Sequence, residues 1–542
     1  MAVIDAASIV PFRDRRIDLE AHLEAFPYVR FRASAEARQL LYFRETREAR
    51  ELWTLPITDG AMALERGVRL GDADWSRRGL REMRYRAAGR EYVVLADDAN
   101  EERYNLFALP IEPGAPMRRL TDRPYVYGFR LDRAGRQVAY VARYGPGQPY
   151  HSCLNVIDME ARADREVVCD TPEVSFTWTR AVFTPDGGTM VISALRASDR
   201  NHENLVAVDL REASPSVRLL TDPGRRRRNV DVERDWLDDA RFLFTSDEDG
   251  FTNVYVYDIA ARTARAITHF TEDVTDIAPF TVGARTVVGA IVRRPYESEL
   301  FVVDPSDGEV LARRVFDATS TFLDHAGDHA MIESESRRTR FQLDEVRVAL
   351  PEPARAEIVV SPRAGVPPDV AARIERCQVE RVQIPTFDID PHTGRTRMLH
   401  AFVQTPRSMP ARLEQRVAFI EGFYGGENHW DTSAQILCDA GAIVVSPSVR
   451  GSAGFGAEFA ALNDHDLGGN EVIDLMYVAR DIARRFQLQP WQIGLFGGSH
   501  GGYEVLRAMT FPRGVNGRDE QFAWGFGVSW FGFSNIVSFY EH

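Results

Sequence analysis

A serine flanked by glycines is the feature of this sequence best suited to chemistry. Ser499 lies in the hexapeptide Gly497–Gly502, between the apolar run Ile493–Phe496 and the helix-favouring run Tyr503–Met509. In a G-x-S-x-G nucleophile elbow, a buried strand turns sharply into a helix and exposes the serine oxygen, and the glycines let the two elements approach. The pattern predicts a nucleophilic serine, although a purely structural or phosphate-holding turn would have the same residues.

His500 follows the serine and begins the expected helix. The first N–H groups of a helix have no partner within it and attract negative charge. We therefore expect the backbone N–H of His500 to stabilise the oxyanion that forms when Ser499 attacks a carbonyl. The side chain of His500 is not expected to act as the base.

Length and charge limit the class of protein. A chain of 542 residues exceeds what one hydrophobic core usually holds, so two large domains, or one large and one small, are expected. The 66 basic and 80 acidic residues give a net charge of −14, which argues against a nucleic-acid partner. Every basic residue is arginine, so lysine-based catalysis is excluded.

The cysteines and the N-terminus predict a reducing, aqueous location. Cys153, Cys169, Cys377 and Cys438 form no CxxC pair, so we expect reduced, buried thiols and no zinc site. No motif calls for a cofactor or a metal, and none is expected. The start, Met1–Asp5, lacks a signal-peptide pattern, and no run approaches 18 apolar residues. A cytoplasmic protein without membrane contact is therefore expected.

Short strand-like runs recur through the first two thirds of the chain. Their first residues are 43 to 54 positions apart, which suits one four-stranded blade per repeat. Seven such runs predict a seven-bladed β-propeller over residues 26–350. The runs are Leu52–Ile57, Leu106–Ile111, Leu154–Asp158, Leu205–Asp209, Val254–Asp258, Leu300–Asp304 and the weaker Leu343–Val346.

Two charged segments within the repeats leave alternatives open. The run Arg225–Arg228 is expected to be a solvated loop, with a site for acidic peptide ends as the second interpretation. The turn Ser246–Gly250 could bind calcium, but it lacks the spaced carboxylates of an EF-type loop. A plain turn between strands is the expected outcome there.

Composition changes after the last repeat. Five prolines mark residues 351–375 as a linker, and strands then alternate with helices over residues 376–542. This order predicts the first half of an α/β-hydrolase domain, and residues 1–25 are expected to be an extension that packs on it. The expected elements are an antiparallel pair (377–384 and 398–404), parallel strands (417–420, 442–445, 493–496 and 522–529) and a helix (471–486).

Three stretches together resemble the prolyl oligopeptidase family of serine peptidases, which includes acylaminoacyl peptidases and dipeptidyl peptidases. They are the GGSHGG elbow, the segment Arg450–Gly456 after the strand 442–445, and Tyr424-Gly425-Gly426 after the strand 417–420. The resemblance covers most of the chain and implies a propeller followed by an α/β-hydrolase domain. It also implies a peptidase that needs no cofactor.

The resemblance implies roles for three further residues. The Tyr424 hydroxyl would be the second oxyanion donor beside the His500 N–H, with a packing aromatic as the alternative. Arg450 is expected to anchor a loop through carboxylates. Phe531 follows the strand after the elbow helix and would line the substrate pocket, with a core phenylalanine as the equal alternative.

One part of the family pattern has no counterpart in the sequence. The triad order is serine, acid, base, but only His500 and His542 follow Ser499, and the later family strands that would carry the acid and base are absent. We expect an incomplete product of a longer peptidase, or else a weakened enzyme. The predicted function is serine-type hydrolysis of short peptides, with a size-selecting propeller. A binding scaffold with a vestigial hydrolase half and an esterase are the alternatives, and homo-oligomerisation is left open.

Overall fold

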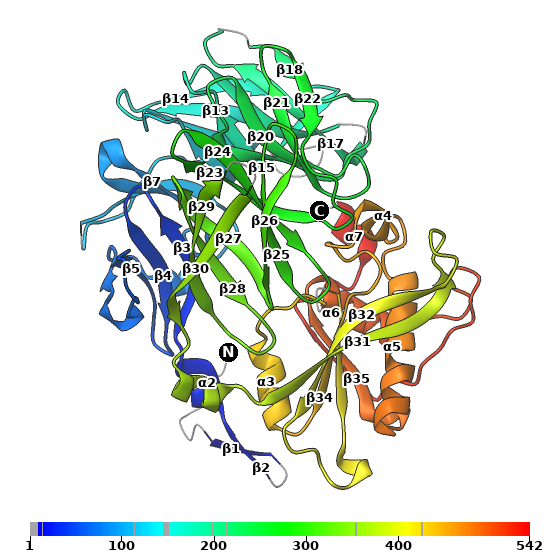
Figure 1. The fold of residues 1–542 in the computed structure, drawn as a ribbon. Helices are drawn as coiled ribbons and strands as arrows, with labels where there is room; N and C mark the ends of the chain where they lie inside the picture. The colour runs from blue at the N-terminus through cyan, green and yellow to red at the C-terminus, as the bar shows by residue number, and fades with distance from the viewer. Residues whose placement is uncertain are drawn as a thin grey trace.

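The computed structural model describes residues 9–12, 15–112, 114–144, 151–196, 199–212, 215–352, 355–423 and 426–541. Figure 1 shows two lobes, a large all-β lobe and a smaller one with a sheet between helices. The larger lobe contains the N-terminal two thirds of the chain, and the smaller lobe contains the elbow serine.

The larger lobe is a seven-bladed β-propeller, as the repeats predict. The described residues form seven four-stranded antiparallel sheets that follow one another in the chain. Each of the seven recurring runs falls on the third strand of its blade, where apolar residues are buried between neighbouring blades. The first strand of the last blade lies beside the first strand of the first blade, which closes the ring.

The blades are consecutive groups of four strands. Blades one to three contain β3 (Tyr28–Ser34), β4 (Gln39–Glu45), β5 (Arg50–Pro56), β6 (Val68–Arg69), β7 (Leu80–Arg86), β8 (Glu91–Ala96), β9 (Asn105–Pro110), β10 (Arg118–Arg119), β11 (Tyr125–Leu131), β12 (Gln137–Tyr144), β13 (His151–Asp158) and β14 (Ala163–Cys169). Blades four to seven contain β15 (Val174–Phe183), β16 (Thr189–Arg196), β17 (Asp199–Asp209), β18 (Val217–Leu219), β19 (Val230–Trp236), β20 (Arg241–Ser246), β21 (Asn253–Asp258), β22 (Thr263–Ala266), β23 (Val274–Val282), β24 (Arg285–Arg293), β25 (Ser298–Val303), β26 (Val310–Phe316), β27 (Thr319–Ala326), β28 (His329–Glu335), β29 (Gln342–Glu352) and β30 (Arg355–Gly365).

The smaller lobe is built on a six-stranded sheet in the order β31-β32-β34-β33-β35-β36. Antiparallel pairing joins β31, β32 and β34, and parallel pairing joins β34, β33, β35 and β36. This strand order, with an antiparallel part followed by parallel strands, agrees with the expected α/β-hydrolase fold. The strands are β31 (Cys377–Ile389), β32 (Thr396–Pro406), β33 (Ala418–Glu421), β34 (Ile443–Pro447), β35 (Ile493–Gly498) and β36 (Phe526–Trp530).

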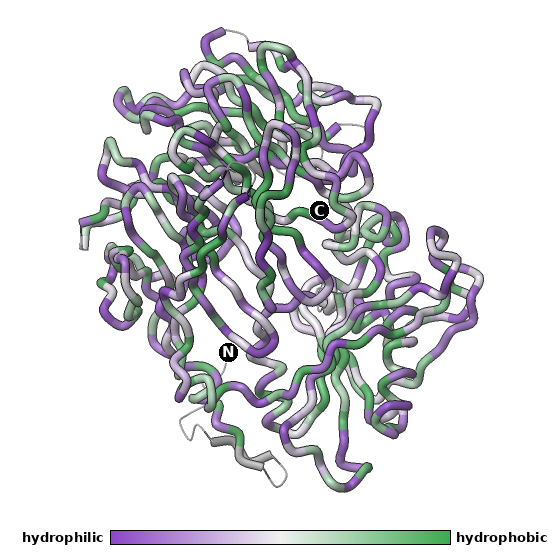
Figure 2. Tube along the Cα trace, viewed as in Figure 1, coloured by the Kyte–Doolittle hydropathy of each residue, from purple (hydrophilic) through white to green (hydrophobic). Residues whose placement is uncertain are grey.

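Helices cover this sheet and complete its core. The long helix α5 (Asn470–Phe486) buries an apolar stripe against the strands, from Val472 to Ile482. In Figure 2 the central strands of the sheet are mostly green, as expected for strands buried on both faces. The other helices of this lobe are α3 (Thr432–Asp439), α4 (Ala457–Ala461), α6 (His500–Met509) and α7 (Ile536–Glu541).

Two element boundaries differ from those expected. The strand after the elbow helix begins at Phe526, not 522, because the aromatic rings of Phe522 and Trp524 pack against the hydrolase core just before it. The propeller also continues into the expected linker, since β30 pairs with β29 as far as Gly365. Proline is tolerated on an outer strand, which explains how Pro362 can lie within β30.

The N-terminal segment contacts both lobes. It contains β1 (Ile9–Phe12), β2 (Arg15–Asp18) and α1 (Leu19–Glu24), and α1 lies near α2 (Pro368–Ile374) and α3. His22 of α1 is buried and its Nε2 is 3.3 Å from Oδ2 of Asp439 at the end of α3. Burial lowers the pKa of His22, although Asp439 opposes this shift.

The expectation of four reduced thiols is wrong. Cys153 and Cys169 are bonded across the neighbouring strands β13 and β14, and Cys377 is bonded to Cys438. The second bond joins the start of β31 to α3. Neither disulfide could be predicted from the sequence, because the two cysteines of each pair are 16 and 61 residues apart and meet only through strand pairing and helix packing.

Candidate active site

Ser499 occupies the turn between β35 and α6. Its φ of 53° and ψ of −122° form a combination that residues other than glycine rarely adopt. Residues 493–497 are buried, whereas Ser499 is exposed. The structure thus combines a buried strand, a strained and exposed serine, and a helix, which is the geometry of a nucleophile elbow.

Glycines at the elbow permit contacts that no side chain would allow. A Cβ atom on Gly497 would lie 2.7 Å from the carbonyl carbon of Gly501. A Cβ atom on Gly502 would lie 2.8 Å from Cα of Gly532, in the loop after β36. The sequence reason for these glycines is therefore close packing of β35, α6 and that loop.

His500 is the first residue of α6, so its N–H belongs to the end of the helix that faces the serine turn. Its imidazole is largely buried and stacks on Phe423, with ring centroids 4.3 Å apart. The imidazole Nε2 is 3.3 Å from Oε1 of Glu471 on α5. These two contacts hold the side chain of His500.

Tyr424, the expected second oxyanion donor, lies outside the described residues. The preceding residue, Phe423, is described, and its N–H donates to Oε2 of Glu504 at 2.5 Å. Glu504 is on α6, one helical turn after His500. The loop that leads to Tyr424 is therefore tied to the helix that follows the nucleophile.

Sequence reasoning missed Glu471 and Glu504, which are both fully buried. Burial raises the pKa of Glu504 well above its usual range, and the nearby Glu471 raises it further, whereas the Phe423 N–H opposes this shift. The available signal was an acidic residue at position 504 within a helix whose neighbouring positions are apolar and buried. Glu471 gave no such signal, because acidic residues are common in the first turn of a helix.

Arg450 anchors a loop, as the sequence predicts. Its guanidinium donates two hydrogen bonds to Asp474 on α5 and one to Asp388 on β31. The side chain is 4% exposed. Arg450 therefore fixes the segment after β34 against the hydrolase core.

Phe531 lies beside the elbow and does not belong to the core. Its side chain is 81% exposed, which rules out the core alternative. A Cβ atom on Gly498 would be 2.7 Å from Cε2 of Phe531, so the ring covers the end of β35. The residue has a φ of 43° in the turn after β36.

A cavity of about 380 Å³ opens among the first strands of the blades, and a smaller one of about 150 Å³ lies between the two lobes. The smaller cavity includes Phe423, whose ring stacks on His500. Its propeller wall includes Arg293, which pairs with Glu427 of the hydrolase wall at 2.8 Å. Both lobes therefore line this cavity, and its link to the elbow is the ring of Phe423 against His500.

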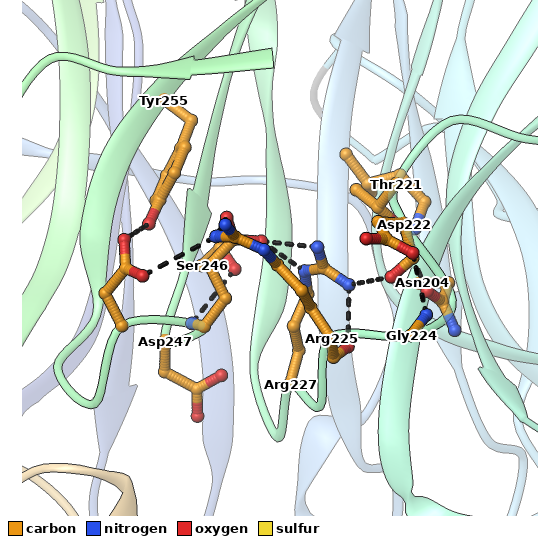
Figure 3. Close-up of polar contacts among 12 residues, drawn as sticks. Asn204, Thr221, Asp222, Gly224, Arg225, Arg227, Ser246, Asp247 and Tyr255 are labelled. Atoms are coloured by element: carbon orange, nitrogen blue, oxygen red, sulfur yellow. Dashed lines mark hydrogen bonds and ion pairs between the residues drawn. The ribbon is translucent and has the colours of Figure 1, made fainter. Parts of the chain in front are cut away.

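The run Arg225–Arg228 is solvated only in its first half, because Arg225 and Arg226 are exposed, whereas Arg227 is buried and Arg228 is partly buried. Figure 3 shows Arg225 and Arg227 among the carboxylates and carbonyls of neighbouring loops. Arg227 is 3% exposed and pairs with Glu248. Arg228 reaches the other lobe, where Nη2 donates to Oδ1 of Asp464 at 2.9 Å. The sequence could not reveal this role, because the partner is 236 residues away.

The acidic turn Ser246–Gly250 is occupied by protein groups. Asp247 accepts the N–H of Arg228, and Asp249 accepts the hydroxyl of Tyr255 at 2.9 Å. These contacts use the carboxylates of Asp247 and Asp249 within the protein, as expected for a turn with a structural role. No helix in the described part of the chain has both the length and the apolar character needed to cross a membrane.

Comparisons with known proteins agree with this geometry. Residues 428–517 match the model of the prolyl oligopeptidase family, Peptidase_S9. A segment of 143 residues is 33% identical to dipeptidyl aminopeptidase BIII of Pseudoxanthomonas mexicana. That match covers 24% of this chain and only 20% of the length of the relative.

Solved structures share the two-lobed fold. Prolyl oligopeptidase B from Galerina marginata is similar with a TM-score of 0.73 at 13% identity, over 96% of this chain and 75% of that one. A puromycin-hydrolysing peptidase of Mycobacterium tuberculosis is similar with a TM-score of 0.70 at 16% identity, over 98% of this chain and 81% of that one. The family match includes the elbow at Ser499, and the propeller and the hydrolase sheet give this chain the same overall fold as these peptidases.

Proposed function

We propose that this protein is a serine peptidase that hydrolyses short peptides through an acyl-enzyme, with Ser499 as the nucleophile. The backbone of Ser499 is the observation that carries the proposal. A serine at φ 53° and ψ −122°, exposed between a buried parallel strand and a helix, is strained in the way that a nucleophile elbow requires.

Oxyanion stabilisation accounts for the groups around the serine. The Ser499 oxygen would attack the scissile carbonyl, release the amine and leave an ester that water hydrolyses. The His500 N–H and the Tyr424 hydroxyl would stabilise the negative oxygen, each lowering the barrier by about 3 kcal/mol. We assign no acid or base among the described residues, because the imidazole of His500 is held by Phe423 and Glu471.

The propeller would restrict the size of the substrate. Support comes from the cavity between the lobes, whose walls include Arg293 of the propeller and Phe423 of the hydrolase lobe. A folded protein would not fit a space of about 150 Å³, whereas one or two residues of a flexible peptide would. Phe531, exposed beside Gly498, would line the pocket for the residue before the scissile bond.

A cytoplasmic location stays a proposal, and one observation weighs against it. Disulfides persist mainly in oxidising compartments, and both Cys153–Cys169 and Cys377–Cys438 are bonded. Fractionation of the source cells, with a count of free thiols on the isolated protein, would decide between the cytoplasm and an oxidising compartment.

The test is an activity assay on the full-length gene product. Short aminoacyl and dipeptidyl reporters, a simple ester and a folded protein are compared for wild type, Ser499→Ala and the exposed loop variant Ser306→Ala. We expect turnover of the short peptides only. The rate of turnover should fall by several orders of magnitude in Ser499→Ala and should not change in Ser306→Ala. Ester turnover without peptide cleavage would indicate an esterase, and inactivity of the wild type would indicate a binding scaffold. Full activity of Ser499→Ala would refute the proposal.

A further inference from the structure

Three side chains that can bind a metal converge on the inner side of α6. Glu471 comes from the first turn of α5, and His500 and Glu504 are one turn apart on α6 and therefore share a face. Their ligand atoms all lie within 4.8 Å of one another. The exposed fractions of the three residues are 0%, 9% and 0%.

Among the described residues, protein groups satisfy only one oxygen of each carboxylate in this cluster. Glu471 Oε1 accepts the N–H of Gly468 at 2.6 Å, and Glu504 Oε2 accepts the N–H of Phe423. In the described ranges, the other oxygen of each carboxylate, Glu471 Oε2 and Glu504 Oε1, has no hydrogen-bond partner. Buried carboxylate oxygens without a donor, a proton or a cation are costly, so each of the two oxygens calls for one of these.

The spacing of the atoms fits a shared metal ion as well as a long hydrogen bond. Nε2 of His500 and Oε1 of Glu471 are 3.3 Å apart, which is long for a hydrogen bond to a carboxylate. Two ligands of a tetrahedral zinc ion, each bonded at about 2.0–2.1 Å, are separated by about 3.3 Å. One imidazole and two carboxylates also form a donor set that zinc accepts.

We propose that Glu471, His500 and Glu504 bind a divalent transition-metal ion of the zinc class. Its two positive charges would balance the two buried carboxylates. The ion would join α5 to α6 and, through Glu504 and the Phe423 N–H, would hold the loop that leads to Tyr424. Its role is structural, and it does not depend on peptidase activity.

A proton shared between the two carboxyl groups is the competing account. Such a pair could satisfy one of the two unpartnered oxygens, but it would not involve the imidazole. The two accounts differ in metal content and in how stability responds to zinc, so both quantities are measured.

The first measurement is the metal content of the full-length protein. Wild type, the double variant Glu471→Gln/Glu504→Gln and the control Glu380→Gln, whose side chain is 66% exposed, are purified without a metal-affinity tag and analysed by mass spectrometry. We expect about one zinc-class ion per chain in wild type and control. The double variant should contain at least roughly tenfold less. Equal metal content in wild type and double variant would overturn the proposal.

The second measurement is thermal unfolding with and without zinc, after refolding in a chelator. Zinc should raise the Tm of wild type and of Glu380→Gln but not that of the double variant. In chelator alone the double variant should be at least as stable as wild type, because it lacks the buried negative charges. A misfolded variant would instead have a lower Tm in chelator. A wild-type Tm that does not respond to zinc would overturn the proposal in favour of the shared proton.

Discussion

Arg450 and Asp474 form a buried ion pair with two parallel hydrogen bonds. Nε donates to Oδ2 at 2.9 Å and Nη2 donates to Oδ1 at 2.8 Å. The side chains are 4% and 0% exposed, so water screens the pair very little. This contact fixes the segment after β34 to the helix that leads into the elbow strand.

Replacement of Arg450 by methionine should destabilise the protein by about 3–5 kcal/mol, because it leaves the Asp474 carboxylate buried without its cation. Arg450→Lys keeps the charge but cannot form the two parallel hydrogen bonds of the guanidinium, so its loss of stability should be intermediate. Urea unfolding of the two variants measures these differences. A loss below about 1 kcal/mol for Arg450→Met would contradict this role.

Arg228 and Asp464 join the propeller to the hydrolase lobe, and each side chain is about one fifth exposed. Partial exposure limits the coupling between them to about 0.5–1 kcal/mol. We expect Arg228→Ala and Asp464→Ala each to speed hydrogen exchange around residues 456–466, and the double variant to do no more than either one. Additive effects in that double-mutant cycle would show that the two residues act independently.

Stability should depend on pH through Glu333, which lines the propeller cavity. Burial, and then Glu335, raises its pKa to about 8 despite Arg32. The folded protein therefore binds more protons than the unfolded chain between pH 4.5 and about 8. Proton binding by Glu333 therefore contributes to the stability of the folded protein. This contribution to the free energy of unfolding is complete below pH 4.5 and is lost as the pH rises to 8.

Glu333→Gln should remove this loss of stability at high pH, because glutamine stays neutral at every pH. The free energy of unfolding of the variant minus that of wild type should increase from pH 4.5 to 8 by roughly 1–2 kcal/mol, since the cavity is open to solvent. Glu309→Gln, at an exposed position, is the control. Chemical denaturation at several pH values measures both, and a difference that is flat for Glu333→Gln would be inconsistent with its raised pKa.

Reduction should destabilise the hydrolase lobe. The bond between Cys377 and Cys438 spans 61 residues, and closing a loop of that size contributes about 4 kcal/mol in the chain-entropy model. A reductant should therefore lower the Tm, and Cys438→Ser should lower it without reductant. Four reactive thiols in the unfolded, unreduced protein would show instead that neither disulfide forms.

Local patterns predicted the elements that depend on local sequence. Alternating apolar residues placed the third strand of every blade, and the glycines around Ser499 placed the elbow. Glu471, the disulfides and the contact between Arg228 and Asp464 could not be predicted in this way. Each of these joins residues that meet only after the blades or helices have packed.

The start of β36 and the end of the propeller were misplaced for a related reason. The apolar run from 522 serves two purposes, since Phe522 and Trp524 pack on the core before the strand begins at Phe526. The prolines after residue 350 indicated a linker, but Pro362 lies on an outer strand where it removes no essential hydrogen bond. Composition alone does not distinguish these cases.

The reactivity of Ser499 is the most direct test of the central claim. The full-length protein is incubated with a fluorophosphonate, and the labelled residue is located by peptide mass spectrometry. An activated elbow serine should carry the label at Ser499, and Ser499→Ala should remain unlabelled while Ser306→Ala reacts as wild type does. A label on another residue, or none on the folded full-length protein, would contradict the assignment of Ser499 as the nucleophile.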